Sequence, residues 1–460
     1  MNRKILILLI ALLSACANKL ELKPDSAIIL PKTAKDLELL LEHTEIMNHT
    51  PGLAQVSADE YFIPTQQLWQ SIASPTARNA YIWAKDIYEG ETNIKDWTGL
   101  YNAIFYCNNV LDILAQQDIN NDAEKKRLKG WALFARAYTF YSLLSIFAKP
   151  YDAATASTDP GIPLKLNANI DEIEPRSTVQ HSYDQLIADA QQSIGLLQQD
   201  IIKGKPNQPS KVAAYAFLAR VYLSMRKYEQ AEIYADQCLA IYSKLTDFNT
   251  LSKSGNAWNS TSTSEEVIYY SGAYPTYSAI SIGLSLNYGI SMELINLYDP
   301  SDLRLPIYFQ INKDGNYNMK YINTYAGFPF TGLATDEVML IKAECLARRG
   351  QTEASMDIVN QIGVKRWNPN ATTPAKPYQN MTASSPETAL EKVLTERRKA
   401  LVWRSVRWTD LRRLNLEGRN ISTSRTLGNQ VYTLQPNSPL YVLPIPDDEI
   451  ALSGVAQNVR

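Results

Sequence analysis

The densest group of charged side chains lies near the C-terminus, in the stretch TERRKALVWRSVRWTDLRRL. Charged side chains could polarise a substrate or transfer protons. The group consists of Glu396, Arg397, Arg407, Asp410, Arg412 and Arg413, with Trp408 among them. If the start of this stretch and the residues just before it form a helix, four apolar residues form its buried stripe: Leu390, Val393, Leu394 and Leu401. Glu396 and Arg397 then lie beside this stripe and can pair with charges of the next turn or helix, so the pattern favours a structural role.

The sequence lacks the residue patterns of common catalytic and metal sites. Its only histidines are His43, His49 and His181, and it contains neither HExxH nor a Gly-x-Ser-x-Gly elbow. It has no glycine-rich phosphate loop, and no pair of acidic residues stands out for glycoside hydrolysis. We therefore predict a protein that is not an enzyme, with no cofactor and no metal site.

Composition and charge narrow the range of partners. The 460 residues carry 45 Lys and Arg against 47 Asp and Glu, so no basic field is available to attract nucleic acid. Apart from Cys16, the cysteines are Cys107, Cys238 and Cys345, which lie in apolar helical patterns, and we predict three buried thiols. The 27 tyrosines and 8 tryptophans suit surfaces that meet sugars or peptides, although such rings also fill helix interfaces.

The first residues have the three parts of an export signal. A positive start is followed by an apolar core, residues 5–13, and by a Leu-Ser-Ala-Cys junction that ends at Cys16. The core is shorter than the roughly 20 residues that a membrane span needs. The junction resembles the bacterial lipobox, which implies acylation of Cys16. We expect a lipoprotein signal peptide at 1–15 and a lipid-anchored tether at 16–34; an ordinary secretory signal is the alternative.

Helical periodicity dominates the rest of the chain. WTGLYNAIFYCNNVLDIL and RLKGWALFARAYTFYSLLSIF predict two long helices, the second apolar almost all round. PSKVAAYAFLARVYLSMRKYEQAEIYADQCLAIY has the spacing of a tetratricopeptide repeat, and VMLIKAECLARRGQTEASMDIVNQI is a weaker copy with a turn at Arg349-Gly350. Because single pairs cannot bury their faces alone, we predict a mostly α fold with a scaffold of stacked, tetratricopeptide-like helical pairs.

Two regions interrupt the helical pattern. Residues 46–94 and 246–333 are rich in aromatic residues, and the second region also contains many Ser, Asn and Gly and one strand-like run, EEVIYYSG. A shorter excursion near 366–386 holds four prolines. We expect a loop-rich, irregular second lobe, and loops on a rigid scaffold are where binding residues often lie.

Eight segments, in order along the chain, resemble the SusD/RagB family, the surface lipoproteins of Bacteroidetes that capture nutrients for an outer-membrane transporter. They are LSAC with LELKPDS, WTGLYNAIFYCNN, ALFARAYTFYSLL, AAYAFLARVYL, MELINLYDPSDLR, DEVMLIKAECLARRG, TERRKALVWRSVRWTDLRRL, and LPIPDDEI with AQN. The resemblance implies an N-terminal SusD-like region of helical pairs at 35–245, a loop-rich insertion at 246–333 and a C-terminal RagB/SusD region at 334–460.

The charged segment departs from the pattern ERR-x-EL-x-x-EG-x-RW-x-DL that family members commonly have. Ala400, Arg404 and Ser405 stand where that pattern has a glutamate, a second glutamate and a glycine. We expect charge pairing to differ there. None of these three positions is one that we would assign to ligand binding.

The resemblance implies a cell-surface lipoprotein of the outer membrane that passes an oligosaccharide to a SusC-like TonB-dependent transporter. Because sugar rings stack on aromatic planes, the candidate ligand-binding residues are aromatic residues of the two irregular regions: Trp69, Tyr81, Trp83, Trp258, Tyr274, Tyr277 and Tyr288. Any of these rings could instead pin its loop to the scaffold. The alternatives are a peptide ligand, a helical scaffold that holds a protein partner without binding a nutrient, and a glycan-degrading enzyme.

Overall fold

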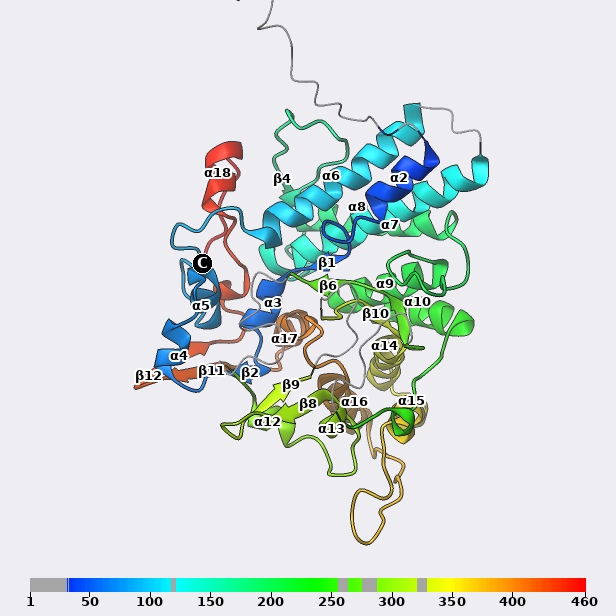
Figure 1. Cartoon of the computed structure of the whole chain (residues 1–460), viewed down its shortest axis with the longest axis vertical. Coiled ribbons are helices and arrows are strands. Elements are labelled where there is room, and N and C mark those ends of the chain that lie inside the picture. The colour runs from blue at the N-terminus through cyan, green and yellow to red at the C-terminus, as the bar shows by residue number, and fades with distance from the viewer. Residues whose placement is uncertain (1–30, 32, 117–120, 255–263, 275–287, 321–328) are drawn as a thin grey trace, which may run out of the picture.

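The computed structural model describes residues 31, 33–116, 121–254, 264–274, 288–320 and 329–460. It is mostly helical, and the longer helices pack in pairs along the top and right of the molecule in Figure 1. The predicted scaffold of helical pairs is confirmed. Within the described residues, no helix combines the length and the apolar character that crossing a membrane requires.

Four helices lie together at the top of Figure 1. They are α2 (Ala34–Leu41), α6 (Lys95–Gln116), α7 (Asp122–Phe147) and α8 (Val179–Ile194). α7 packs against both α6 and α8, and most of its side chains are buried, as its almost continuous apolar sequence predicted. The Asn121 side chain caps α7 by accepting hydrogen bonds from the backbone N–H groups of Ala123 and Glu124 at 3.1 and 3.2 Å.

The two tetratricopeptide-like pairs continue the scaffold. α9 (Lys211–Ser224) packs against α10 (Tyr228–Ile241), and α14 (Thr335–Arg348) packs against α15 (Thr352–Lys365). Ala219, Ala231 and Ala235 are fully buried, because small side chains let paired helices approach closely. α10 also contacts α14, so the two pairs stack on each other as predicted.

Short two-stranded sheets organise the irregular regions. Antiparallel pairs are β2 (Tyr61–Phe62) with β7 (Gly289–Ile290), β3 (Pro160–Pro163) with β4 (Arg176–Thr178), β5 (Val267–Tyr269) with β10 (Leu333–Ala334), and β8 (Phe309–Ile311) with β9 (Tyr317–Met319). β1 (His49–Thr50) pairs with β6 (Gly272–Ala273) in parallel. The β1·β6 and β2·β7 pairings join residues 46–94 to residues 246–333, so the two irregular regions form one lobe. β5 confirms the strand-like run.

Short helices complete this lobe. They are α3 (Gly52–Ser57), α4 (Gln66–Gln70), α5 (Pro75–Tyr81), α12 (Met292–Ile295) and α13 (Arg304–Tyr308), with 3₁₀ turns at Phe248–Thr250 and Pro439–Tyr441. The sequence predicted no helix at 46–94, where three are present. Pro51 precedes α3 and Pro75 begins α5, so proline here sets where short helices start and does not exclude them.

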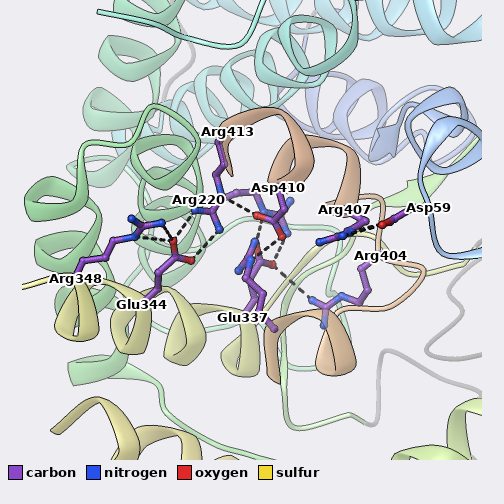
Figure 2. Close-up of polar contacts among 10 residues, drawn as sticks. Asp59, Arg220, Glu337, Glu344, Arg348, Arg404, Arg407, Asp410 and Arg413 are labelled. Atoms are coloured by element: carbon purple, nitrogen blue, oxygen red, sulfur yellow. Dashed lines mark hydrogen bonds and ion pairs between the residues drawn. The ribbon is translucent and has the colours of Figure 1, made fainter. Parts of the chain in front are cut away.

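The C-terminal part contains α16 (Pro386–Ala400), α17 (Arg407–Leu416), a hairpin of β11 (Thr423–Leu427) and β12 (Gln430–Leu434), and α18 (Asp447–Ser453). Its charged side chains pair with one another and with α14 inside the molecule (Figure 2). Arg397 Nε donates to Asp410 at 2.8 Å, and Arg413 Nη1 donates to Glu344 of α14 at 2.6 Å. These buried pairs confirm the structural role predicted for the charged segment.

One detail of that prediction is wrong. Glu396 and Arg397 lie beside the stripe as expected and are only 5% and 3% exposed, but the stripe itself is not buried along its whole length. Glu396 can be buried because it has a charged partner: Arg304, itself buried on α13, donates to it from Nη2 at 2.8 Å. Leu390 and Leu394 are only partly buried, so charged pairs replace part of the apolar stripe on α16.

Candidate functional site

A groove of about 680 Å³ lies where β2, α12 and β11 meet. One wall comes from residues 59–66, a second from the start of α12 and a third from residues 421–428, with side chains of α16 and α17 also lining it. The first two walls are joined by the β2·β7 pairing and by a 2.9 Å hydrogen bond from Ser291 N to Glu60 O. Three distant parts of the chain therefore build one concave surface.

An ion pair is fixed in the wall of the groove. Arg407 donates from Nε and Nη2 to the two carboxylate oxygens of Asp59 at 2.7 and 2.8 Å (Figure 2). Arg398 Nη2 lies 3.5 Å from Asp59, and its Nη1 lies 3.2 Å from Glu293. Although burial acts to raise it, the neighbouring guanidinium groups lower the pKa of Asp59 to about 2. Asp59 is thus ionised at neutral pH and has no proton to give to a leaving group.

Arg425 holds the third wall against the lobe. The centre of its guanidinium lies 4.0 Å from the ring centre of Tyr81 and 4.5 Å from that of Trp83. Its terminal nitrogens donate to the backbone carbonyls of Val56, Ala58 and Tyr81. Rings and carbonyls together stabilise the buried cation, so the β11–β12 hairpin is fixed on α3 and α5.

The rim of the groove is polar and largely exposed. Its hydroxyl and amide groups belong to Thr65, Gln66, Ser291, Ser424 and Thr426. These groups supply both donors and acceptors, which suits a ligand rich in hydroxyl groups. The half-buried ring of Phe62 adds an apolar surface to the same wall. Among the described residues, no group of His, Cys, Asp and Glu side chains could hold a metal ion.

Four of the aromatic candidates are buried: Tyr81, Trp83, Tyr274 and Tyr288 are at most 5% exposed. Trp83 donates from Nε1 to the carbonyl of Ser57 at 3.0 Å. Tyr288 stacks on Trp403 with ring centres 5.2 Å apart. As the structure stands, none of these four rings offers an open face to a ligand. They pack the lobe, because a large ring can be buried when its polar edge finds a partner.

Trp69 is partly exposed, in contrast to those four rings. Its Nε1 donates to the carbonyl of Arg78 at 2.9 Å, which fixes the indole against α5; Trp69 belongs to α4, the helix that also carries Gln66 of the rim. A role of Trp69 in ligand binding therefore stays a prediction. The candidates Trp258 and Tyr277 and the lipidation candidate Cys16 lie outside the described residues.

Several groove residues were not predicted. Phe62 lies in an irregular region with no pattern that distinguishes it, and Arg398 and Arg407 belong to the segment for which a structural role was predicted. The β11–β12 hairpin had a recognisable signal in the sequence, because the two residues Gly428-Asn429 stand between TSRTL and QVYTL, a pair typical of a tight hairpin turn; Gly428 has a φ of 57°.

Two family models match the sequence. The model described as "Starch-binding associating with outer membrane" matches residues 19–223, and the model described as "SusD family" matches residues 311–459. The groove takes its first wall from the former match and its third wall from the latter. The comparison with curated proteins gave no match.

Solved structures have the same fold. A SusD superfamily protein from Bacteroides thetaiotaomicron VPI-5482 is similar with a TM-score of 0.72 and 20% identity, over 93% of this chain and 100% of that chain. SusD-like carbohydrate binding proteins from Bacteroides vulgatus ATCC 8482 and Bacteroides fragilis NCTC 9343 give TM-scores of 0.66 and 0.67 with 18% and 17% identity. Those matches cover 92% of this chain and 97% and 98% of the other two.

The sequence matches and the fold agree. The two family models together span most of the chain, and nearly the whole length of each solved structure is matched. The SusD family consists of binding proteins and not of enzymes. The chain belongs to the SusD/RagB family.

Proposed function

We propose that this protein is a lipid-anchored binding protein of the outer membrane that captures an oligosaccharide and passes it to a SusC-like TonB-dependent transporter. The ligand site is the groove between β2, α12 and β11. The observation that carries this proposal is the lining of that groove, where exposed hydroxyl and amide groups surround fixed ion pairs and an aromatic ring.

The chemistry of the groove fits a hydroxyl-rich ligand. Arg398 and Glu293 offer charged donors and acceptors, and the Glu293 side chain is 79% exposed, so it can turn toward a bound molecule. Asp59 and Arg407 are already locked together, which keeps their orientation unchanged when a ligand arrives. A wall that is ordered in advance loses little entropy on binding.

The proposed location at the outer membrane and the proposed transporter partner are supported by the sequence and by the family. The Leu-Ser-Ala-Cys junction supports acylation at Cys16, and the first family model is named for association with the outer membrane. Two structural relatives are named as carbohydrate binding proteins, which supports a sugar over a peptide. A peptide remains the alternative ligand, because paired carboxylates and guanidiniums also bind peptide groups.

The test is calorimetric titration of the chain that starts after Cys16 with panels of oligosaccharides and of peptides. We expect saturable binding of at least one oligosaccharide. Thr426→Tyr, which places a ring in the groove from an exposed position, should abolish it. Thr158→Tyr is the control, because Thr158 is also an exposed threonine but does not line the groove.

The outcomes separate the alternatives. Binding of peptides alone would replace the sugar by a peptide as the ligand. No binding across both panels would overturn capture by this protein alone and favour the scaffold that holds a protein partner. Binding that Thr426→Tyr leaves unchanged would keep capture but move the site away from this groove.

A further inference from the structure

We infer that a second surface, the cleft between α6, residues 163–174 and α18, binds a segment of a partner protein that carries aliphatic and basic side chains. The cleft has a volume of about 650 Å³. Twelve large apolar side chains are exposed among the described residues, and four of them line this cleft: Phe105, Ile170, Ile173 and Leu452. Scattered apolar side chains need no explanation, but a cluster of them marks an interaction surface. The cleft shares no residue with the ligand groove.

Buried polar contacts hold the segment that carries the two isoleucines. Asn108 of α6 is fully buried and donates from Nδ2 to the carbonyls of Lys165 and Asn167, both at 2.9 Å. Arg136 of α7 donates from Nη1 to Asn108 Oδ1 at 2.9 Å and so fixes the amide. Lys165 and Asn167, which precede the two isoleucines, are therefore anchored to two long helices. The apolar side chains stand on a fixed backbone, and a partner would not have to order it.

α18 forms the opposite wall and buries none of its own side chains. Both of its ends are tied to the body of the protein. Asn93 N donates to Asp448 Oδ2 at 2.7 Å, and beyond the helix Asn458 Nδ2 donates to the carbonyl of Phe147 at 2.8 Å. A helix of seven residues is not stable alone in water, so these ties hold it in place. The result is that Leu452 is presented to solvent with 80% of its surface exposed.

The charges around the cleft have one dominant sign. Four carboxylate side chains line it: Asp171, Glu172, Glu174 and Glu449. Lys165 is the one basic residue in the described lining. Such a field attracts cations and repels anions, and complementary charge sets both the rate and the selectivity of protein association.

A protein segment fits these features better than a sugar or a lipid surface. Most of the exposed apolar groups are branched aliphatic side chains, which give no flat face for a sugar ring. The carboxylates would repel anionic lipid headgroups. Aliphatic side chains of a partner can enter the cleft while lysine or arginine side chains beside them meet the carboxylates. The partner class is therefore a polypeptide with mixed aliphatic and basic residues.

The test uses two labelled synthetic peptides, one alternating leucine with lysine and one alternating leucine with glutamate, titrated with the chain that starts after Cys16. We expect saturable binding of the lysine peptide by fluorescence anisotropy and none of the glutamate peptide. The double variant Ile170→Ser/Leu452→Ser should raise the Kd about tenfold or more, because it removes two apolar side chains that are buried on binding. Asp171→Lys/Glu449→Lys should weaken binding as well.

The control variant is Ile311→Ser/Val431→Ser, whose apolar side chains are 62% and 58% exposed but lie outside the cleft. It should leave the Kd unchanged. The inference is overturned if neither peptide binds, or if the cleft variants and the control act alike. It is also overturned if the cleft variants abolish binding to vesicles of phosphatidylcholine and phosphatidylglycerol, or abolish self-association in sedimentation, while peptide binding is unaffected.

Discussion

The guanidinium of Arg413 lies against the carboxylate of Glu344, with Nη1 2.6 Å and Nη2 2.8 Å from its two oxygens. Arg413 belongs to α17 and Glu344 to α14, so this pair joins the C-terminal charged segment to the tetratricopeptide-like pair α14–α15 (Figure 2). Both side chains are at most 1% exposed. Arg413 also donates from Nε to Asp410 at 2.8 Å, and therefore one cation serves two buried carboxylates.

Arg413→Leu should lower the free energy of unfolding by about 3–5 kcal/mol, because it removes the cation that pairs with two buried carboxylates. The measurement is guanidinium chloride denaturation followed by circular dichroism. The matched control is Arg349→Leu, which breaks a similar two-oxygen pair with Glu232 where the Arg349 side chain is 53% exposed. That change should cost much less, because water screens an exposed ion pair. Equal losses in the two variants would contradict a special role for the buried pair.

The turn between α16 and α17 carries a second testable feature. Ser405 has a φ of 56°, a left-handed conformation that favours glycine. Ser405→Gly should raise the free energy of unfolding by about 0.5–1 kcal/mol, because glycine adopts this conformation without a Cβ penalty. Ser405→Ala should bring no such gain, since alanine keeps the Cβ and loses only the hydroxyl. A stabilisation by alanine equal to that by glycine would show that the hydroxyl, and not φ, matters.

Much of the scaffold could be predicted from the sequence because each helical pair carries its own periodicity. The run apolar on nearly all sides became α7, buried between α6 and α8, and small residues marked where α9 and α10 pack. Helical turns are local, so a window of about 15 residues contains most of the information that is needed to predict a helix. Strands β1 and β2 were not predictable in this way, because each has two residues and exists only through a partner more than 200 positions away.

The groove was harder to predict for the same reason. Its lining comes from residues near 60, 291 and 425, and no local pattern tells that these three parts meet. The aromatic candidates were selected for residue type in irregular regions, where Tyr81 and Trp83 proved to surround the buried Arg425. Residue type alone does not separate a ring that faces a ligand from one that packs against a cation.

The three cysteines of the described region should be unreactive in the folded protein. Cys107, Cys238 and Cys345 are buried free thiols, and burial raises the pKa of Cys107 and of Cys238 to about 12. Since the thiolate is the nucleophile, a thiol reagent should label none of them until denaturant is added, and should then label all three. Ser424→Cys, at an exposed position on the groove rim, is the control that should react at once. Fast labelling of a native cysteine would contradict the burial.

Glu60, which lies behind the groove, should make stability depend on pH. Its carboxylate accepts hydrogen bonds from Gln55 Nε2 at 2.7 Å and from Trp403 N at 3.2 Å. Burial outweighs these bonds and raises the pKa of Glu60 to about 7, above the ordinary value of 4.5. Between these two values the folded state binds more protons than the unfolded state. The free energy of unfolding should therefore fall as pH rises through 7, by up to about 3 kcal/mol from this group.

Glu60→Gln isolates this contribution, because glutamine keeps the shape and cannot ionise. Urea denaturation of both proteins at pH 5 and pH 8 should show a smaller loss of stability at pH 8 in the variant. Neighbouring Asp59 does not interfere, since its pKa of about 2 keeps it ionised across this window. Glu417, whose pKa burial also raises to about 7, contributes equally to both proteins and cancels in the difference. The same pH dependence in both proteins would mean that Glu60 is ionised in the folded state near pH 5, and that its hydrogen bonds outweigh its burial.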